Sequence, residues 1–247
     1  MPRYVAIIEA RMGSSRLPGK VLRDICGKPA LGILVERLSH SQELDGVIVA
    51  TSTAEQDDAI AAWCAAETVD CWRGSEDDVL SRVVGAAEFA GADVIVEITG
   101  DCPLTDPKVV DLAVNTHRIN SCDVVTNCGN KLTWPMGIYA QVFSIEILKR
   151  VAETVFDPAV REHVSLYFYE NEQEYNIIDL IAPLSVRKPQ IRCQLDYLED
   201  LIFLRKVISE LKTTHGFTFD THTLMSHLEN NKDLLSINMN CLERHAR

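Results

Sequence analysis

The stretch that decides the fold is Tyr4-Val5-Ala6-Ile7-Ile8-Glu9, followed directly by Ala10-Arg11-Met12-Gly13-Ser14-Ser15-Arg16-Leu17-Pro18-Gly19-Lys20. Its first part is a short, continuous apolar run, which is typical of a β-strand buried on both faces of a sheet. Its second part holds two glycines, two serines and three cations. Open parallel sheets bind ligands at the carboxyl ends of their strands. We therefore expect an α/β protein with an anion-binding loop after its first strand.

The first half of the chain alternates strand-like apolar runs with helical patterns. Apolar runs predict further strands at residues 46–51, 92–98 and 122–126. Helical patterns lie between these runs, and strands separated by helices of this length predict βαβ units with right-handed crossovers.

Several start signals mark the expected helices. Thr53-x-x-Gln56 matches a capping box for a helix that runs to about residue 67. Ser75 precedes three acids that suit a first helical turn. Asp106-Pro107 and Asp157-Pro158 each predict an N-cap followed by proline at the first helical position.

The pattern changes after about residue 130. We expect strands at residues 136–143, 174–181 and 190–195, and a long helix after Asp196. No repeat or long Gly/Ser linker divides the chain. The sequence therefore predicts a single domain over residues 1–247, with a small inserted lobe at about 130–190.

Composition and charge exclude several classes of protein. The 247 residues are 47% hydrophobic and 24% charged, the balance of a soluble globule. The net charge is −12, so we expect no nucleic-acid partner and no anionic membrane. The first apolar run is too short for a signal peptide, and the eight cysteines form no C-x-x-C pair. These features favour a cytoplasmic protein with reduced, mostly buried cysteines.

The loop after the first strand does not match the common phosphate-binding motifs. Five residues, not four, separate Gly13 from Gly19-Lys20, and Val21 stands where a P-loop has Ser or Thr. The loop also lacks the G-x-G-x-x-G pattern of dinucleotide-binding proteins. A solvated surface loop is the alternative, but arginine and lysine at a strand end suit phosphate oxygens.

The residues from Ala10 to Lys20 resemble the A-R-x-x-S-x-R-L-P-G-K signature of the cytidylyltransferase family. That family includes enzymes that make CMP-activated 3-deoxy-octulosonate and CMP-activated nonulosonic acids, and the likeness is greatest to its spore-coat polysaccharide branch. Four further matches follow in family order: Arg73-Gly74-Ser75-Glu76-Asp77-Asp78-Val79-Leu80-Ser81-Arg82, Thr99-Gly100-Asp101-Cys102-Pro103-Leu104, Arg161-Glu162-His163-Val164 and Leu195-Asp196-Tyr197-Leu198-Glu199-Asp200-Leu201.

The resemblance implies a Rossmann-like open, mostly parallel sheet of the nucleotide-diphospho-sugar transferase type, flanked by helices. It implies catalytic roles for Arg16, Lys20, Asp101 and Asp196, with the two aspartates holding Mg²⁺, for which Mn²⁺ can substitute. The implied nucleotide-binding residues are Ala10, Arg11, Gly13, Ser14, Ser15, Arg73, Ser75, Thr99 and Gly100. The implied acceptor-binding residues are Tyr139, Gln141, Arg161 and His163. The family also implies a homodimer.

Each of these assignments has a structural alternative. Asp101 could close a turn, and Asp196 could be an N-cap with Glu199 as its capping-box partner. Arg73-Gly74-Ser75 could be a strand–helix turn. Arg161 and His163 could lie on a solvated helix face.

The chain departs from the family pattern in three places. Tyr139 and Gln141 replace two acids of a P-x-G-x-D-x-E-V-F segment, and Glu97 stands where the branch often has a basic residue. If Tyr139 and Gln141 alternate along one strand, both face the same side. These changes bear on the acceptor and leave the loop and both aspartates untouched.

We therefore expect an enzyme that transfers CMP from CTP to a small acidic sugar or phosphorylated acceptor, releases pyrophosphate, and serves surface polysaccharide or glycoconjugate synthesis. One alternative is a nucleotidyltransferase of the same fold that uses UTP or GTP. The other is an inactive nucleotide-binding regulator.

Overall fold

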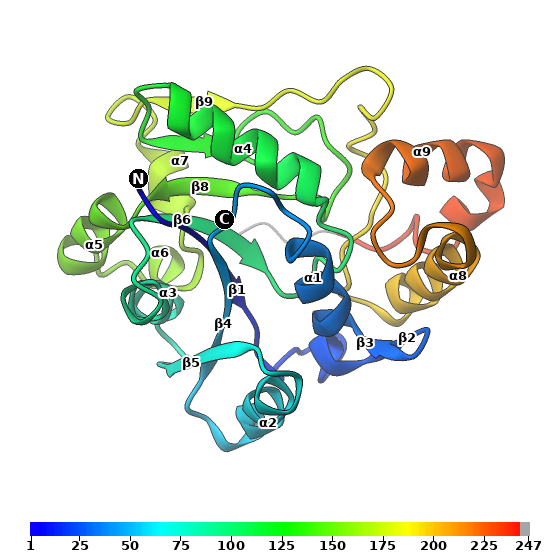
Figure 1. Ribbon diagram of the computed structural model, residues 1–247, viewed down its shortest axis with the longest axis horizontal. Coiled ribbons are helices and arrows are strands. Elements are labelled where there is room, and N and C mark those ends of the chain that lie inside the picture. Colours follow the sequence, from blue (N-terminus) through cyan, green and yellow to red (C-terminus); the bar gives the residue numbers. More distant parts are fainter. Residues whose placement is uncertain (243–247) are drawn as a thin grey trace.

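A seven-stranded sheet in the order β5-β4-β1-β6-β8-β7-β9 forms the centre of the protein. The computed structural model describes residues 1–242 (Figure 1). All neighbouring strands are parallel except that β8 runs antiparallel to β6 and β7. The strands are β1 (Tyr4–Glu9), β4 (Gly46–Ser52), β5 (Asp70–Gly74), β6 (Val94–Thr99), β7 (Val124–Thr126), β8 (Gln141–Ser144) and β9 (Ile177–Asp179).

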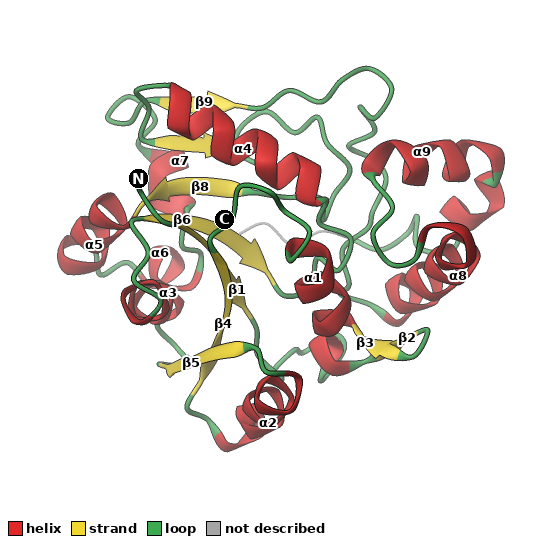
Figure 2. Cartoon of the chain, viewed as in Figure 1, coloured by secondary structure: helices red, strands yellow, loops and turns green. Residues whose placement is uncertain are grey.

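Helices cover both faces of this sheet (Figure 2). On one face, apolar side chains of the strands pack against α1 (Ala30–Leu38), α2 (Asp58–Glu67) and α4 (Pro107–Ile119). On the other face they pack against α3 (Val79–Phe89), α5 (Ile145–Thr154), α6 (Pro158–Glu162) and α7 (Leu166–Glu170). Because each strand is covered on both sides, its residues are apolar in succession rather than in alternation.

A third apolar core lies beyond the sheet. It joins α8 (Leu198–His215) and α9 (Thr221–Asn230) to the short hairpin of β2 (Asp24–Ile25) and β3 (Lys28–Pro29). Within residues 1–242 the chain also forms three 3₁₀ turns, at Lys20–Leu22, Glu55–Asp57 and Lys232–Ser236. None of the helices that the structure describes has the length and apolar composition that a membrane span requires.

The strongest sequence signals correspond closely to the structure. The strands expected at 46–51, 92–98 and 122–126 are β4, β6 and β7, with ends that differ by one or two residues. Asp106 and Asp157 cap α4 and α6, since their carboxylates accept hydrogen bonds from Lys108 N and Ala159 N. The fold prediction of a mostly parallel sheet flanked by helices is confirmed.

Two predicted helix starts were wrong. The capping box at Thr53 is not formed, and α2 begins at Asp58 after a 3₁₀ turn. Asp57 instead serves the first loop, where its carboxylate accepts a hydrogen bond from Met12 N at 2.7 Å. The acids after Ser75 lie before α3, whose N-cap is Asp78.

The strand predictions after residue 130 were partly wrong. The segment expected at 136–143 becomes a strand only at β8, and 190–195 forms one isolated bridge, between Met136 and Arg192. Gly137 has a φ of +86°, and a Cβ there would lie 2.6 Å from Gln194 N. This turn conformation brings the two segments together but prevents a regular ladder.

Residues 130–190, where we expected an inserted lobe, contribute β8 and β9 to the central sheet and α5 to α7 to one face. The eight cysteines are free thiols, and Cys64, Cys102 and Cys193 are buried.

Candidate active site

A cavity of about 580 Å³ opens at the carboxyl ends of β1 and β6. It is lined by many of the predicted site residues, namely Ala10, Arg11, Gly13, Ser14, Ser15, Arg16, Lys20, Thr99, Gly100, Asp101, His163 and Asp196. The structure therefore gathers residues that lie up to 186 positions apart in the sequence, from Ala10 to Asp196, around one space.

Backbone hydrogen bonds fix the first loop at the cavity rim. Ser14 N and Gly19 N both donate to Met12 O, at 2.9 and 3.0 Å. Gly19 has a φ of +67°, a conformation that glycine adopts without strain. The loop is therefore a folded turn with defined side-chain directions rather than a solvated surface loop.

The second wall of the cavity depends on close backbone contacts. Gly100 N donates to Glu9 O at 2.8 Å, and a Cβ on Gly100 would lie 2.7 Å from that same oxygen. Leu195 N donates to Asp101 O at 2.8 Å, which places the segment before α8 beside the end of β6. Asp101 and Asp196 are neighbours for this reason.

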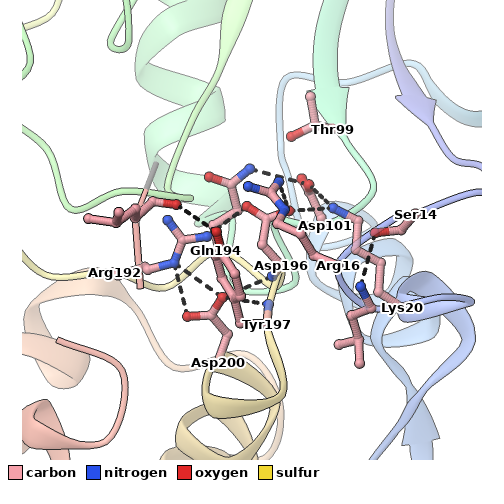
Figure 3. A network of polar contacts seen from close by, with 12 residues as sticks. Ser14, Arg16, Lys20, Thr99, Asp101, Arg192, Gln194, Asp196, Tyr197 and Asp200 are labelled. Atoms are coloured by element: carbon pink, nitrogen blue, oxygen red, sulfur yellow. Dashed lines mark hydrogen bonds and ion pairs between the residues drawn. The ribbon is translucent and has the colours of Figure 1, made fainter. Parts of the chain in front are cut away.

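Both predicted catalytic aspartates converge on Lys20 (Figure 3). Its Nζ lies 2.5 Å from Asp101 Oδ2 and 2.7 Å from Asp196 Oδ1. Two carboxylates that share one cation are close enough to hold a divalent metal ion together, and Mg²⁺ prefers oxygen ligands. The donor set therefore fits a magnesium or manganese ion.

Lys20 and Asp101 each stabilise the charged form of the other. Burial alone would raise the pKa of Asp101, but the charge and hydrogen bond of Lys20 hold it below its ordinary value. Burial likewise opposes the charge on Lys20, while Asp101 and Asp196 raise its pKa above the ordinary value. Asp101 and Lys20 are therefore both charged at neutral pH.

The alternative roles for these aspartates do not hold. The turn after β6 is closed by the backbone hydrogen bond from Cys102 N to Thr99 O, not by the Asp101 carboxylate. The N-cap of α8 is Tyr197 and not Asp196. The side chain of Asp200 accepts from the backbone N of both Asp196 and Tyr197, at 2.9 Å each.

Arg16 lies beside the same aspartate. Its Nη2 is 2.7 Å from Asp196 Oδ1, and its guanidinium carbon lies 5.1 Å from the centre of the Tyr197 ring. Its Nη1 is buried without a hydrogen-bond partner within residues 1–242. A buried donor without an acceptor is costly, and an anionic oxygen in the cavity would satisfy it.

A buried ion network holds Asp196 from behind (Figure 3). Arg192 Nη2 lies 2.6 Å from Asp196 Oδ2, and Arg192 Nε lies 2.9 Å from Asp200 Oδ1. Asn238 Nδ2 donates to Asp200 Oδ1 at 2.9 Å. Arg192 therefore fixes one oxygen of Asp196 while Lys20 and Arg16 contact the other.

Two predicted nucleotide-binding residues lie outside the cavity lining. Arg73 donates to Ser52 O at 2.8 Å and pairs with Asp58, so it fastens the end of β5 to the loop after β4. Ser75 Oγ accepts from Asp78 N at 3.1 Å at the start of α3. Both contacts match the strand–helix turn alternative.

Three of the four predicted acceptor-binding residues also lie away from the cavity lining. Tyr139 precedes β8, so it does not alternate with Gln141 along one strand as expected. Gln141 accepts a hydrogen bond from the Tyr169 hydroxyl. Arg161 pairs with Asp78, which joins α6 to α3. His163 alone of the four lines the cavity.

Sequence reasoning missed six residues that line the cavity: Glu9, Val21, Val79, Arg82, Glu162 and Gln194. Most of them lie within or next to the quoted family segments. Glu9 carried a signal of its own, because it is an acid at the end of an otherwise apolar buried strand.

Glu9 and Glu97 form a coupled pair of carboxyl groups beneath the cavity. The two carboxyl groups are near neighbours, and the charge of Glu97 acts on Glu9. Burial, together with the Glu97 charge, raises the pKa of Glu9 well above its ordinary value. Burial also raises the pKa of Glu97 from 4.5 to about 7, although hydrogen bonds from Ser165 and Glu9 act against this.

This pair should make stability depend on pH. Because both pKa values are raised on folding, the folded state binds more protons than the unfolded state above about pH 4.5. The contribution is therefore fully present below pH 4.5 and is lost as the pH rises through about 7. Relative to Glu9→Gln, the wild type should lose roughly 1–2 kcal/mol of unfolding free energy between pH 5 and pH 8. Urea unfolding at both pH values measures this difference, and parallel pH profiles of the two proteins would contradict it.

Comparisons with known proteins agree with this geometry. The cytidylyltransferase family model matches residues 5–237. The spore coat polysaccharide biosynthesis protein SpsF of Bacillus subtilis is 36% identical over 199 residues, which is 78% of this chain and 81% of that protein. The 3-deoxy-manno-octulosonate cytidylyltransferase of Syntrophobacter fumaroxidans is 33% identical over 183 residues, covering 68% of this chain and 73% of its own.

A solved structure supports the same assignment over the whole fold. A cytidylyltransferase from Leptospira borgpetersenii superimposes with a TM-score of 0.90 at 29% identity, covering 99% of this chain and 100% of its own. The family match spans nearly the whole chain, and the cavity gathers most of the residues of its signature loop. This protein belongs to the cytidylyltransferase family and is a CTP-dependent nucleotidyltransferase.

Proposed function

We propose that this enzyme transfers CMP from CTP to a small acidic sugar or phosphorylated acceptor, releases pyrophosphate, and serves the synthesis of a surface polysaccharide or glycoconjugate. The observation that carries the proposal is the convergence of Arg16, Lys20, Asp101 and Asp196 on one cavity. The names of two relatives, a spore coat polysaccharide protein and an octulosonate cytidylyltransferase, support the acceptor class.

In this mechanism the first loop binds the triphosphate. Lys20 has three donors, and two of them face Asp101 and Asp196, so one is left for a phosphate oxygen. The unpartnered Nη1 of Arg16 supplies another. Ser14 and Ser15 line the same wall and add hydroxyl donors.

Asp101 and Asp196 would hold the metal ion, Mg²⁺ or Mn²⁺. A bound divalent ion supplies charge stabilisation at the phosphates and orients them. The chain's own cations then act on the same reaction. Arg16 and Lys20 offset the charge that develops at the α-phosphate and on the departing pyrophosphate, and the fixed loop keeps the attacking and leaving oxygens in line.

The acceptor would enter beside His163. This residue and Glu162 line the cavity at the end of α6, and Glu162 pairs with Arg11 of the loop at 3.1 Å. An imidazole and an arginine at one side of the cavity suit an acceptor with a carboxylate or phosphate. We place acceptor recognition here rather than at Tyr139 and Gln141, which lie outside the cavity lining.

A panel of acidic sugars and phosphorylated alcohols, each assayed with CTP by pyrophosphate release, tests the acceptor class. One acidic or phosphorylated compound should give turnover that a neutral sugar does not. Turnover with neutral acceptors alone would overturn this part of the proposal while leaving CTP use intact.

Loss of either loop cation should reduce activity strongly. Arg16→Ala and Lys20→Ala should each lower kcat/KM by roughly 10²- to 10³-fold, because each removes one stabiliser of transition-state charge. Arg23→Ala is the matched control, since this exposed arginine lies just beyond the loop and its side chain donates to the backbone oxygen of Pro18. Near-normal turnover in both Arg16 and Lys20 variants would contradict the triphosphate assignment.

We also propose a homodimer, as the family resemblance implies. Light scattering behind size exclusion should give twice the chain mass of 27.6 kDa. A single-chain mass at micromolar concentrations would contradict it.

A further inference from the structure

Glu9 and Glu97 have no part in the chemistry described so far, although they lie under the active-site cavity. Glu9 ends β1, and Glu97 lies in the neighbouring strand β6. In the sheet register Ile7 pairs with Glu97 and Glu9 pairs with Thr99. The two glutamates are therefore diagonal neighbours on the same face, the one that α3 and α7 cover.

The surroundings of Glu97 orient this pair. Ser165, just before α7, donates its hydroxyl hydrogen bond to Glu97 Oε2. Glu9 Oε1 is buried and has no hydrogen-bond partner among the described residues. Burial raises the pKa of both carboxyl groups, so the pair retains a proton more readily than two exposed glutamates would.

The hydrogen-bonding group that Glu9 offers to a ligand in the cavity depends on which of its oxygens carries a proton. A carboxyl oxygen that carries no proton can only accept a hydrogen bond. Glu9 is partly exposed and lines the cavity. Its unpartnered Oε1 would be satisfied by a donor group of a bound ligand. A ligand that contacts Glu9 must therefore present a hydrogen-bond donor to it.

A buried donor lines the same cavity. Arg82, on α3, is 2% exposed, and its Nη1 donates to Ser75 O at 2.6 Å. Its Nε has no acceptor within the described part of the chain. The wall thus offers an acceptor on Glu9 and a donor on Arg82, and the apolar side chain of Val79 lines the same space.

The cytosine ring presents the complementary pair. Its exocyclic amino group is a donor and the adjacent ring nitrogen N3 is an acceptor, whereas uracil has a carbonyl and an N–H at these positions. We propose that Glu9, positioned by Glu97, determines base specificity by accepting a hydrogen bond from the cytosine amino group, with Arg82 Nε donating to N3.

Nucleotide binding tests this without any acceptor substrate. Dissociation constants for CTP and UTP are measured by calorimetry on the wild type, Glu9→Gln and Glu9→Leu, with Mg²⁺ present. Glutamine can donate its amide N–H to Glu97 and present its carbonyl to the cavity, so Glu9→Gln should stay within about threefold of wild type for both nucleotides. Glu9→Leu should weaken CTP binding by about 10- to 100-fold and change UTP binding by less than about threefold.

Glu88→Gln is the matched control, because Glu88 is an exposed acid on α3 that pairs with Lys149. Its ratio of UTP to CTP dissociation constants should equal that of the wild type. Equal weakening of CTP and UTP in Glu9→Leu, or an unchanged ratio, would overturn the proposal.

If Glu9→Leu does not fold, a modified nucleotide tests the same contact on the wild type. The triphosphate of pyrimidin-2-one riboside lacks only the amino group of CTP. It should bind the wild type about 10- to 100-fold more weakly than CTP does. Equal affinity for the two nucleotides would show that the protein does not read the amino group, and that result too would overturn the proposal.

Discussion

Asp101→Asn and Asp196→Asn should each reduce the rate of pyrophosphate release from CTP by at least about 10³-fold while the protein stays folded. The two carboxylates meet at one point, where both contact Lys20 Nζ. Asparagine keeps the shape of the side chain but removes the charge that would hold a divalent ion. The same variants should lose Mn²⁺ binding in the presence of CTP, which electron paramagnetic resonance measures without an acceptor.

Asp220→Asn is the control for these variants. Asp220 is a helix-capping acid outside the cavity lining, at the N-terminus of α9, where its carboxylate accepts from Thr223 N at 2.9 Å and pairs with Lys108. Its loss should lower stability by about 0.5–1 kcal/mol and leave Mn²⁺ binding unchanged. If Asp196→Asn behaves like Asp220→Asn, Asp196 has only a structural role.

The parts of the fold that the sequence predicted well are those governed by local chemistry. The runs at Tyr4–Glu9 and Gly46–Ser52 are apolar because helices cover both sides of the sheet. Asp before Pro at 106–107 and 157–158 marks helix starts because the carboxylate satisfies free backbone N–H groups. Neither signal depends on residues far away in the sequence.

The failed predictions involve distant contacts. Thr53-x-x-Gln56 has the pattern of a capping box, but Asp57 accepts from Met12 N and from Ser52 Oγ, and the chain enters α2 one turn later. Residues 190–195 look like a strand, yet their partner segment contains Gly137 at positive φ. No local pattern reveals that the two segments meet.

The site was predictable in its chemistry but not in its full extent. The cations of the first loop and the two aspartates could be recognised, since their types and order resemble the family motifs. Arg73 and Arg161 have the same chemistry, but their guanidinium groups pair with Asp58 and Asp78. Arg82 was missed because its significance lies in a missing partner, which only the packed structure reveals. Glu9 had a local signal, an acid at the end of an apolar strand, but its missing partner is likewise visible only in the structure.

The loss of Arg192 should have the largest effect on stability of any substitution at the site. Arg192 is almost completely buried and contacts Asp196 and Asp200, which are buried as well. Arg192→Met would leave two carboxylates without their shared cation, and removing one member of a buried ion network costs about 3–5 kcal/mol. Thermal or urea unfolding measures this loss. Arg187→Met is the control, because that exposed arginine bonds only the backbone oxygen of Ala182, and its loss should cost less than about 1 kcal/mol.

A double variant separates the structural role of Arg192 from its role in positioning Asp196. Replacing Asp200 by asparagine in the Arg192→Met background removes the uncompensated charge and keeps an oxygen for the backbone N–H groups of Asp196 and Tyr197. Stability should then recover by at least about 1–2 kcal/mol. Mn²⁺ binding with CTP should not recover, because Asp196 Oδ2 still lacks the donor that fixes its orientation. Recovery of both properties together would mean that Lys20 and Arg16 alone orient Asp196, and that the buried network serves stability only.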